Sequence, residues 1–308
     1  MDKKLCLLVD LYELTMAQSY FIYRKDALAT FDLFVRKLPR NRSYLIAAGL
    51  RDILDYIKNL KFSLSDINYL RSQKIFSENF LNYLAKFKFK GDIWAMPEGE
   101  VFFPDEPVIR VTASVIEAQI IESFFLNTIN LQAMITSKAS RVVLAAKKKK
   151  VFDFALRRTH GSDAAIKVAR SSYIAGFNGT ATILAGKLYG IPIVGTMAHS
   201  FVMSFKHEID SFLAYANTFP GHTVLLVATY NTKKGIENAV TIGLYLKEKK
   251  YRLQGIRLDS GDIVCWSKTA RKMLDSAGLN YTKVVASGNL DEFKIKDLLK
   301  RRACVDSF

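Results

Sequence analysis

The stretch Gln254-Gly255-Ile256-Arg257-Leu258-Asp259-Ser260-Gly261-Asp262 decides the fold of this 308-residue chain. A short apolar run gives way at once to charged residues, which is the pattern of a buried β-strand whose carboxyl end carries a site. An arginine beside two carboxylates can bind an anionic group, hold a cation such as Mg²⁺ and bond to sugar hydroxyls. The stretch therefore predicts a buried strand that ends in a binding site.

The second half of the chain repeats this order of strand, polar cluster and helix. Strands that alternate with helices favour parallel pairing and right-handed crossovers, as in a β/α barrel. The predicted strands span residues 151–154, 191–194, 223–227, 255–258 and 283–286. The predicted helices span residues 163–177, 180–188, 205–217, 234–248, 265–277 and 291–300.

The first half is less regular and mixes helical with extended patterns. Its predicted elements are helices over 10–23, 45–60 and 63–87, a strand over 30–35, a small sheet within 91–112, and one or two long helices over 114–146. We therefore predict an α/β protein with a smaller N-terminal α/β domain, residues 1–130. An irregular, incomplete β/α barrel follows over residues 131–308.

Composition limits the classes of function. The formal charge of +16 makes a basic nucleic-acid-binding protein one alternative, but the lysines are scattered over predicted helix faces. A site for a phosphorylated small molecule would also use a positive field. No apolar stretch is long enough to span a membrane, and three cysteines without metal-ligand spacing indicate a reduced, cytoplasmic protein. No nucleic-acid or membrane partner is expected.

Three further polar clusters follow predicted strands. Phe154 and Arg157 follow the first strand, where a ring could stack on a flat ligand and a guanidinium could pair with an anion. His199 follows the second, at the position of a nucleophile or general base. Gly288 follows the last, in a turn before a helix N-terminus that could bind an anion. A core phenylalanine, solvated arginines and a structural histidine remain open alternatives for these residues.

Taken together, five segments resemble the nicotinate phosphoribosyltransferase family in order and spacing. The segments are Asp10–Met16, Phe31–Pro39, Phe154–Gly161, Gly195–Ser200 and Arg257–Asp262. The resemblance implies a type II phosphoribosyltransferase that works as a homodimer. It implies that nicotinate and phosphoribosyl pyrophosphate condense to nicotinate mononucleotide, with Mg²⁺ bound to the pyrophosphate substrate. ATP is the implied co-substrate, and its hydrolysis would be coupled to the reaction through a phosphohistidine at His199.

The resemblance also implies roles for single residues. Phe154 would stack on the pyridine ring, and Tyr12 of the other subunit would cover its second face. Arg257 would bind the nicotinate carboxylate. Asp259 would bind ribose hydroxyls, act with His199 in catalysis and hold Mg²⁺ indirectly. The remaining implied substrate contacts are Arg157 and Arg36 at phosphates, with Thr180, Ser260 and Gly288.

The sequence departs from the family pattern in two places. Family members usually have Asp-Thr-Tyr-Asp where this chain has Ala228-Thr229-Tyr230-Asn231, so a carboxylate that could orient His199 is absent. The sequence ends at Phe308, where family members continue into a glycine-rich phosphate-binding loop. We therefore expect a barrel that lacks its last strands, with an open edge and little activity. A non-catalytic, truncated remnant of the family is the second hypothesis.

Overall fold

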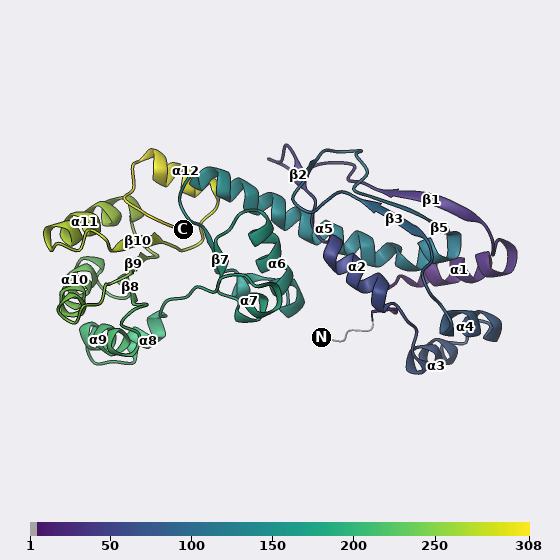
Figure 1. The fold of residues 1–308 in the computed structure, drawn as a ribbon, viewed down its shortest axis with the longest axis horizontal. Coiled ribbons are helices and arrows are strands. Elements are labelled where there is room, and N and C mark those ends of the chain that lie inside the picture. Colours follow the sequence, from purple (N-terminus) through teal and green to yellow (C-terminus); the bar gives the residue numbers. More distant parts are fainter. Residues whose placement is uncertain (1–4) are drawn as a thin grey trace. The chain divides into compact units, whose positions relative to one another are not determined.

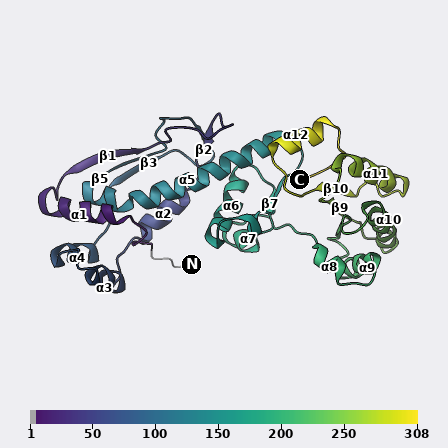
Figure 2. The ribbon, with the colours of Figure 1, turned by 180° about the vertical axis from the view of Figure 1, so that it is seen from behind.

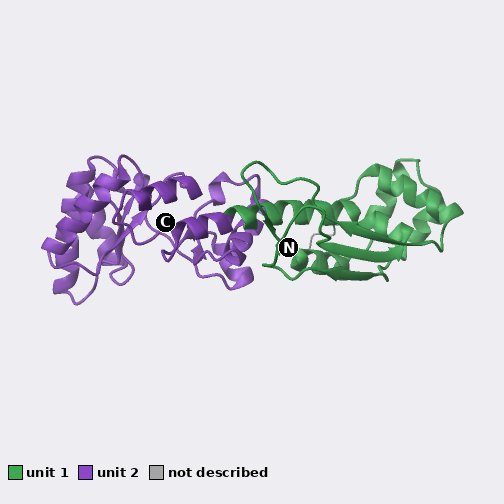
Figure 3. Ribbon diagram, turned by 90° about the horizontal axis from the view of Figure 1, so that it is seen from above, with its two compact units in different colours: residues 1–138 green, residues 139–308 purple. Residues whose placement is uncertain are grey.

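The computed structural model describes residues 5–308 and divides the chain into two compact units, residues 1–138 and 139–308 (Figure 3). This division and the boundary that we predicted at residue 130 both fall within one helix, α5 (Val115–Ala146). No helix within residues 5–308 is both long and apolar enough to cross a membrane.

Unit 1 is an antiparallel sheet covered by helices. The sheet has the order β1-β5-β3, with the strands β1 (Leu28–Leu33), β5 (Ile109–Ser114) and β3 (Asp92–Ala95). Helices α1 (Leu11–Tyr23) and α5 lie along it in Figure 1. The other elements are β2 (Leu45–Ile46), β4 (Val101–Phe102), α2 (Leu50–Asn59), α3 (Leu64–Ser72) and α4 (Glu78–Ala85).

Two helices predicted for unit 1 are wrong in extent. The expected helix 45–60 begins only at Leu50, because Gly49 adopts a φ of +109° and residues 45–46 pair with β4. The expected helix 63–87 is two helices, because the Ser77 side chain accepts a hydrogen bond from the Phe80 N–H and starts α4 anew. The long helix over 114–146 is confirmed as the single helix α5.

Unit 2 contains the parallel strands. Its strands are β6 (Phe152–Asp153), β7 (Gly179–Thr180), β8 (Val224–Leu226), β9 (Gly255–Leu258) and β10 (Lys283–Ala286). Its helices are α6 (Ser162–Ile174), α7 (Ile183–Tyr189), α8 (His199–Met203), α9 (Glu208–Thr218), α10 (Thr232–Glu248), α11 (Ile263–Ser276) and α12 (Glu292–Lys300), with a 3₁₀ turn at Leu156–Arg158. Strands β9 and β10 have the predicted limits.

Three predictions for unit 2 need correction. The helix predicted from residue 180 begins at Ile183, because Thr180 belongs to β7, which was not predicted. The strand predicted at 191–194 contributes only one bridge, between Ile193 and Thr180. The helix predicted over 205–217 is preceded by the short helix α8, and its own first residue is Glu208.

The parallel segments of unit 2 are linked into one curved arrangement. Strands β8, β9 and β10 are adjacent in sequence order, as the two opposite views in Figures 1 and 2 show. Beyond β10, Ser307 bridges to Val285 on one side and to Lys150 on the other. Strand β6 then pairs with β7. Residues 306–308 therefore occupy the position beside β10.

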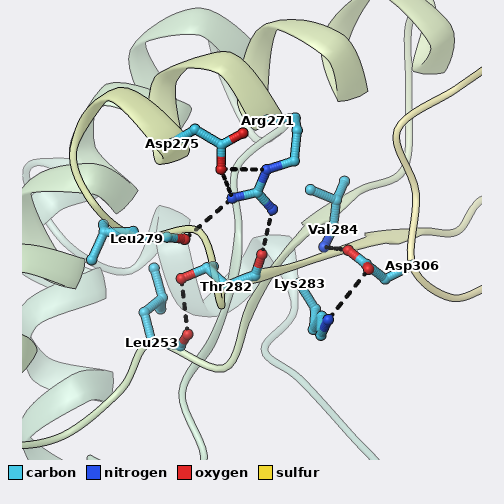
Figure 4. Close-up of polar contacts among 8 residues, drawn as sticks. All are labelled: Leu253, Arg271, Asp275, Leu279, Thr282, Lys283, Val284 and Asp306. Carbon is cyan, nitrogen blue, oxygen red and sulfur yellow. Dashed lines mark hydrogen bonds and ion pairs between the residues drawn. The ribbon is translucent and has the colours of Figure 1, made fainter.

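We call residues 306–308 the closing segment. The Asp306 carboxylate accepts the Val284 N–H at 2.9 Å, and the Phe308 carbonyl accepts the Phe152 N–H at 2.9 Å. Close by, Arg271 donates to the Thr282 carbonyl at 2.7 Å and pairs with Asp275 (Figure 4). Buried backbone groups here find partners, which stabilises this side of the barrel.

The other side of the arrangement has no such ladder. Within residues 5–308, no strand pairing joins β8 to residues 191–194. We call this break the seam. The polypeptide after it, residues 195–199, lies next to the carboxyl ends of β8 and β9, as the hydrogen bonds below show. The seam therefore meets the edge of the sheet where barrels of parallel strands carry their sites.

Candidate functional site

The candidate site is centred on three side chains from different segments. His199, the first residue of α8, has its Nε2 atom 2.8 Å from Asp259 Oδ2. Arg257 lies in β9, and its Nη2 atom is 3.6 Å from the same Asp259 oxygen. One carboxylate oxygen thus faces both a histidine and an arginine. Such a triad can bind an anion, hold hydroxyl groups and move a proton.

Arg257 is a largely buried cation with unused hydrogen-bonding capacity. Its Nη1 atom donates to Thr196 Oγ1 at 2.8 Å, whereas its Nε atom is buried without a partner. Burial lowers the pKa of the Arg257 guanidinium; Asp259 opposes this shift, and the positive charge of Arg157 adds to it. The positive charges of Arg257 and Arg157 therefore act on each other, and the carboxylate of Asp259 beside Arg257 opposes them. An anionic ligand would relieve this excess of positive charge.

The backbone of Asp259 is fixed by a close approach of the next strand end. Gly288 has a φ of +97°, and a Cβ atom built there would lie 2.4 Å from the Asp259 carbonyl oxygen. Only glycine fits this place without movement of the backbone. A cavity of about 470 Å³ opens beside the contact. Its lining includes Asp259, Ser260, Gly261, Ser287, Gly288 and Lys294.

The segment after β6 carries the predicted ring-stacking residue. Phe154 is 38% exposed, so its ring is available to a ligand. It follows Asp153, whose buried carboxylate accepts from Thr180 Oγ1 at 2.7 Å and from the Ala155 N–H at 2.9 Å. The Thr180 hydroxyl also accepts the Thr182 N–H, so it anchors this turn. Its predicted contact with substrate stays a prediction.

The end of β8 supplies the second partner of the histidine. Thr229 Oγ1 lies 3.2 Å from His199 Nδ1. Its neighbour Ala228 is buried and brings no polar side chain. Asn231 caps α10 by accepting the Lys234 N–H at 3.0 Å, so the polar residue at this position has a structural task. In this segment Thr229 therefore contacts the imidazole of His199, and Asn231 caps α10.

Two predicted residues belong to unit 1. Tyr12 is 53% exposed on α1, and its hydroxyl lies 3.3 Å from Glu13 Oε1. Arg36 is exposed in the segment after β1. Their roles at a substrate stay predictions.

Sequence reasoning missed two threonines that bond to the central side chains. Thr196 and Thr229 each follow a predicted strand within a polar cluster, which was the available signal, but a threonine in such a place has no chemistry that singles it out. Within residues 5–308, no group of three or more His, Cys, Asp or Glu side chains is arranged to hold a metal ion.

Comparison with known proteins identifies the family. The model of the nicotinate phosphoribosyltransferase N-terminal domain matches residues 7–130, and the model of the nicotinate phosphoribosyltransferase family matches residues 149–304. The chain belongs to the nicotinate phosphoribosyltransferase family. The matched regions contain all five segments that carried the resemblance in sequence.

Similar proteins cover nearly the whole chain. Nicotinate phosphoribosyltransferase pncB2 of Mycobacterium tuberculosis is 48% identical over 302 residues, which are 98% of this chain and 65% of that protein. Nicotinate phosphoribosyltransferase of Bacillus subtilis is 41% identical and is matched over 62% of its length. This chain thus spans less than two thirds of these relatives.

The fold is also found in solved structures. The structure resembles the crystal structure of human nicotinic acid phosphoribosyltransferase with a TM-score of 0.91 and 28% identity, over 97% of this chain and 72% of that one. A nicotinate-nucleotide pyrophosphorylase from Pyrococcus furiosus has the same fold, with a TM-score of 0.79 and 24% identity. The predicted fold class, an irregular β/α barrel preceded by an α/β domain, is confirmed.

Proposed function

We propose that this chain carries the site of a nicotinate phosphoribosyltransferase, which condenses nicotinate with phosphoribosyl pyrophosphate to give nicotinate mononucleotide and pyrophosphate. The observation that carries the proposal is the contact of Arg257, Asp259 and His199 at the carboxyl edge of the strands. The reaction needs a fixed cation for a carboxylate, an acceptor for ribose hydroxyls and room for phosphates, and the site offers each of them.

In this proposal Arg257 and Phe154 bind nicotinate. The exposed Phe154 ring stacks on the flat pyridine ring, and the Arg257 guanidinium pairs with its carboxylate. Arg157 contributes positive charge nearby and binds a phosphate. These contacts hold the pyridine nitrogen toward C1′ of the ribose, so that pyrophosphate leaves as the nitrogen attacks. Orientation of the two reactants accounts for much of the rate enhancement in such displacements.

Asp259 binds the ribose in this proposal. Its Oδ1 atom is buried without a hydrogen-bond partner, as expected of an acceptor that a ligand hydroxyl or a metal-bound water completes. Ser260 and Gly288 line the adjacent cavity, where pyrophosphate oxygens would lie. Mg²⁺ would reach the site with the pyrophosphate substrate and neutralise its charge. Asp259 would hold that ion through water.

We further propose that ATP is a co-substrate and that His199 takes its γ-phosphoryl group, releasing ADP. Among the four histidines of the chain, His199 has a carboxylate on one ring nitrogen and a hydroxyl on the other. Labelled ATP should leave an acid-labile label that His199→Ala removes and that the control His222→Ala keeps. Equal labelling of both variants would assign the phosphate elsewhere.

A homodimer completes the proposal, with Tyr12 and Arg36 placed at the neighbouring subunit's site. Unit 1 exposes apolar side chains of a kind that dimers bury. They are Leu11, Tyr12, Tyr23, Leu28, Phe31 and Trp94. We place the reaction in the cytoplasm, consistent with three cysteines that form no disulfide. Mixing Tyr12→Ala and Phe154→Ala proteins should restore part of the activity if the sites are shared.

A second candidate function is a non-catalytic member of the family. Ala228 supports it, since no carboxylate from this segment reaches the imidazole. Formation of nicotinate mononucleotide by the purified chain separates the two proposals. Activity that is abolished in Arg257→Ala supports the enzyme, whereas nicotinate binding without turnover supports the non-catalytic form. Under the enzymatic proposal, Ala228→Asp should increase ATP labelling of His199.

A further inference from the structure

The imidazole of His199 has a hydrogen-bond partner at each nitrogen, and the two partners differ in what they can do. Asp259 is an acceptor when ionised, and its position beside Arg257 suits that form. The hydroxyl of Thr229 can donate or accept. An ionised carboxylate at Nε2 requires a hydrogen on Nε2. A neutral ring then has its lone pair on Nδ1, which within residues 5–308 faces the hydroxyl of Thr229.

We propose that Thr229 is a positioning residue for His199. Its hydroxyl donates to Nδ1 and, together with Asp259 at Nε2, holds the neutral ring as the Nε2–H tautomer. The hydrogen positions are assigned from this network of acceptors. The tautomer depends on the contacts alone, whereas the effect of Thr229 on rate rests on the proposed function.

The backbone around Thr229 is fixed at both ends, as a positioning role requires. On one side the Val227 N–H donates to the Arg257 carbonyl at 3.2 Å, continuing the pairing of β8 with β9. On the other side Asn231 caps α10. The residue between them is thus held by a strand and by a 17-residue helix. Asp259 is fixed equally well, because Gly288 packs against its carbonyl.

The position of the pair explains why side chains hold the ring. His199 follows residues 191–194, which have no backbone pairing with β8. Its contact with Thr229 therefore connects the two sides of the seam directly. Thr196, from the same polypeptide segment, bonds to Arg257 of β9. Without Thr229 the ring would keep Asp259 but would be free to turn about that single contact.

The test uses the full chain with ¹⁵N-labelled histidine. Two-bond ¹H–¹⁵N spectra at about pH 9, where imidazoles are ordinarily neutral, report the tautomer of each histidine. We expect the Nε2–H tautomer for His199. In the parent protein and in Thr229→Ser, we also expect His199 Nδ1 to have the chemical shift of a nitrogen that accepts a hydrogen bond. In Thr229→Val we expect that shift to be lost. His160, His207 and His222 are internal references.

Activity gives the second measurement. Thr229→Val should lower the rate of ATP-dependent labelling about threefold to tenfold, the effect of one neutral hydrogen bond, and Thr229→Ser should restore it. Nicotinate affinity should not change. Thr218→Val is the matched control, because the Thr218 hydroxyl bonds only to the Ala214 carbonyl within α9.

An Nδ1–H tautomer in the parent protein would overturn the inference. So would an Nδ1 resonance that is the same in the parent and in Thr229→Val. If the parent protein neither labels nor turns over, the proposed function fails, but the spectra still decide the role of Thr229. If Thr229→Val does not fold, Thr229→Ala, which also lacks the hydroxyl, gives the same comparison of the Nδ1 resonance.

Discussion

On one side of the barrel unit, backbone hydrogen bonds join residues 306–308 to β10 and to β6. On the other side, no strand pairing within residues 5–308 joins β8 to residues 191–194, and the segments that follow them meet through the side chains of His199 and Thr229. In the closing segment Ser307 and Phe308 are buried, and backbone hydrogen bonds join the segment to both of its neighbours. At the carboxyl end of β9, Arg257 Nε and Asp259 Oδ1 are buried without hydrogen-bond partners. The comparison separates a side that stabilises the fold from a side that is left incomplete for a ligand.

The largest effect on activity is expected at Gly288, where backbone packing fixes a residue of the site, Asp259. In Gly288→Ala the new Cβ would overlap the Asp259 carbonyl oxygen at 2.4 Å, so the end of β9 must move. Displacement of a catalytic group by about 1 Å can lower activity about 100-fold. The measurement is the rate of nicotinate mononucleotide formation. The control is Gly221→Ala, where a Cβ meets nothing within 4 Å. Equal rates for the two variants would contradict the expected strain.

Removal of the Arg257 cation should weaken nicotinate binding more than it lowers the free energy of unfolding. Arg257→Ala should weaken nicotinate binding by about 1.5–3 kcal/mol, because the substrate carboxylate loses a charged hydrogen-bond donor. The free energy of unfolding should change less, since the cost of burying most of the guanidinium, with Nε unpaired, offsets part of the gain from its contacts with Thr196 and Asp259. Calorimetric titration with nicotinate and urea unfolding measure the two quantities. Arg252→Ala, beside the Tyr281 ring, is the control. Nicotinate affinity equal to the parent's would exclude the assigned role.

The opposite result is expected on the closing side. Asp306→Ala leaves the buried Val284 N–H without its acceptor, which should lower the free energy of unfolding by about 1–3 kcal/mol. Nicotinate affinity should stay within error of the parent's value. Asp306→Asn keeps an acceptor oxygen and should recover most of the stability. A loss of nicotinate binding in folded Asp306→Ala protein would mean that the two sides are not independent.

The smallest effect concerns Asp262, three residues after Asp259. Its side chain caps α11, and the N–H groups that it accepts, with Cys265 first, hold the pKa of its carboxyl below the usual value. Its stabilising effect is therefore present above about pH 4, the ordinary range of aspartate, and is lost as the pH falls through the lower folded value. Asp262→Ala should be less stable than the parent at pH 7, with a difference that shrinks in acid.

Thermal unfolding across pH checks this expectation, with Asp262→Asn as the variant that keeps a capping oxygen. Nicotinate affinity should be the same in all three proteins. A stability difference that grows toward acid would reverse the sign of the linkage and remove the capping explanation.

The sequence predicted best those elements whose local pattern and tertiary pairing agree. Strands β9 and β10 are apolar runs followed by polar residues, and both have the predicted limits. Residues 191–194 have the same apolar pattern but form one bridge, because pairing depends on a partner elsewhere in the chain. Strand β7 is only Gly179 and Thr180, too short for any periodicity.

The site was predicted where residue chemistry is distinctive. Arginine, histidine and aspartate at strand ends indicated a cluster, and the structure places Arg257, His199 and Asp259 in contact. Their roles stay predictions. Thr196 and Thr229 could not be selected, because a hydroxyl becomes informative only when its partner is known. The close approach of Gly288 to Asp259 is a property of backbone packing, which no local pattern encodes.

The bridge between Lys150 and Ser307 has a consequence for the order in which the unit forms. Its two residues are roughly 150 positions apart, and contacts of such separation form late because a long loop must close first. During synthesis β6 leaves the ribosome early. One of its two neighbours, residues 306–308, is made only later, so that edge of β6 stays unpaired until then. Over that interval β6 presents unpaired N–H and carbonyl groups, which is the situation that invites pairing with other chains. Pairing with residues 306–308 thus ends this exposure of the β6 edge.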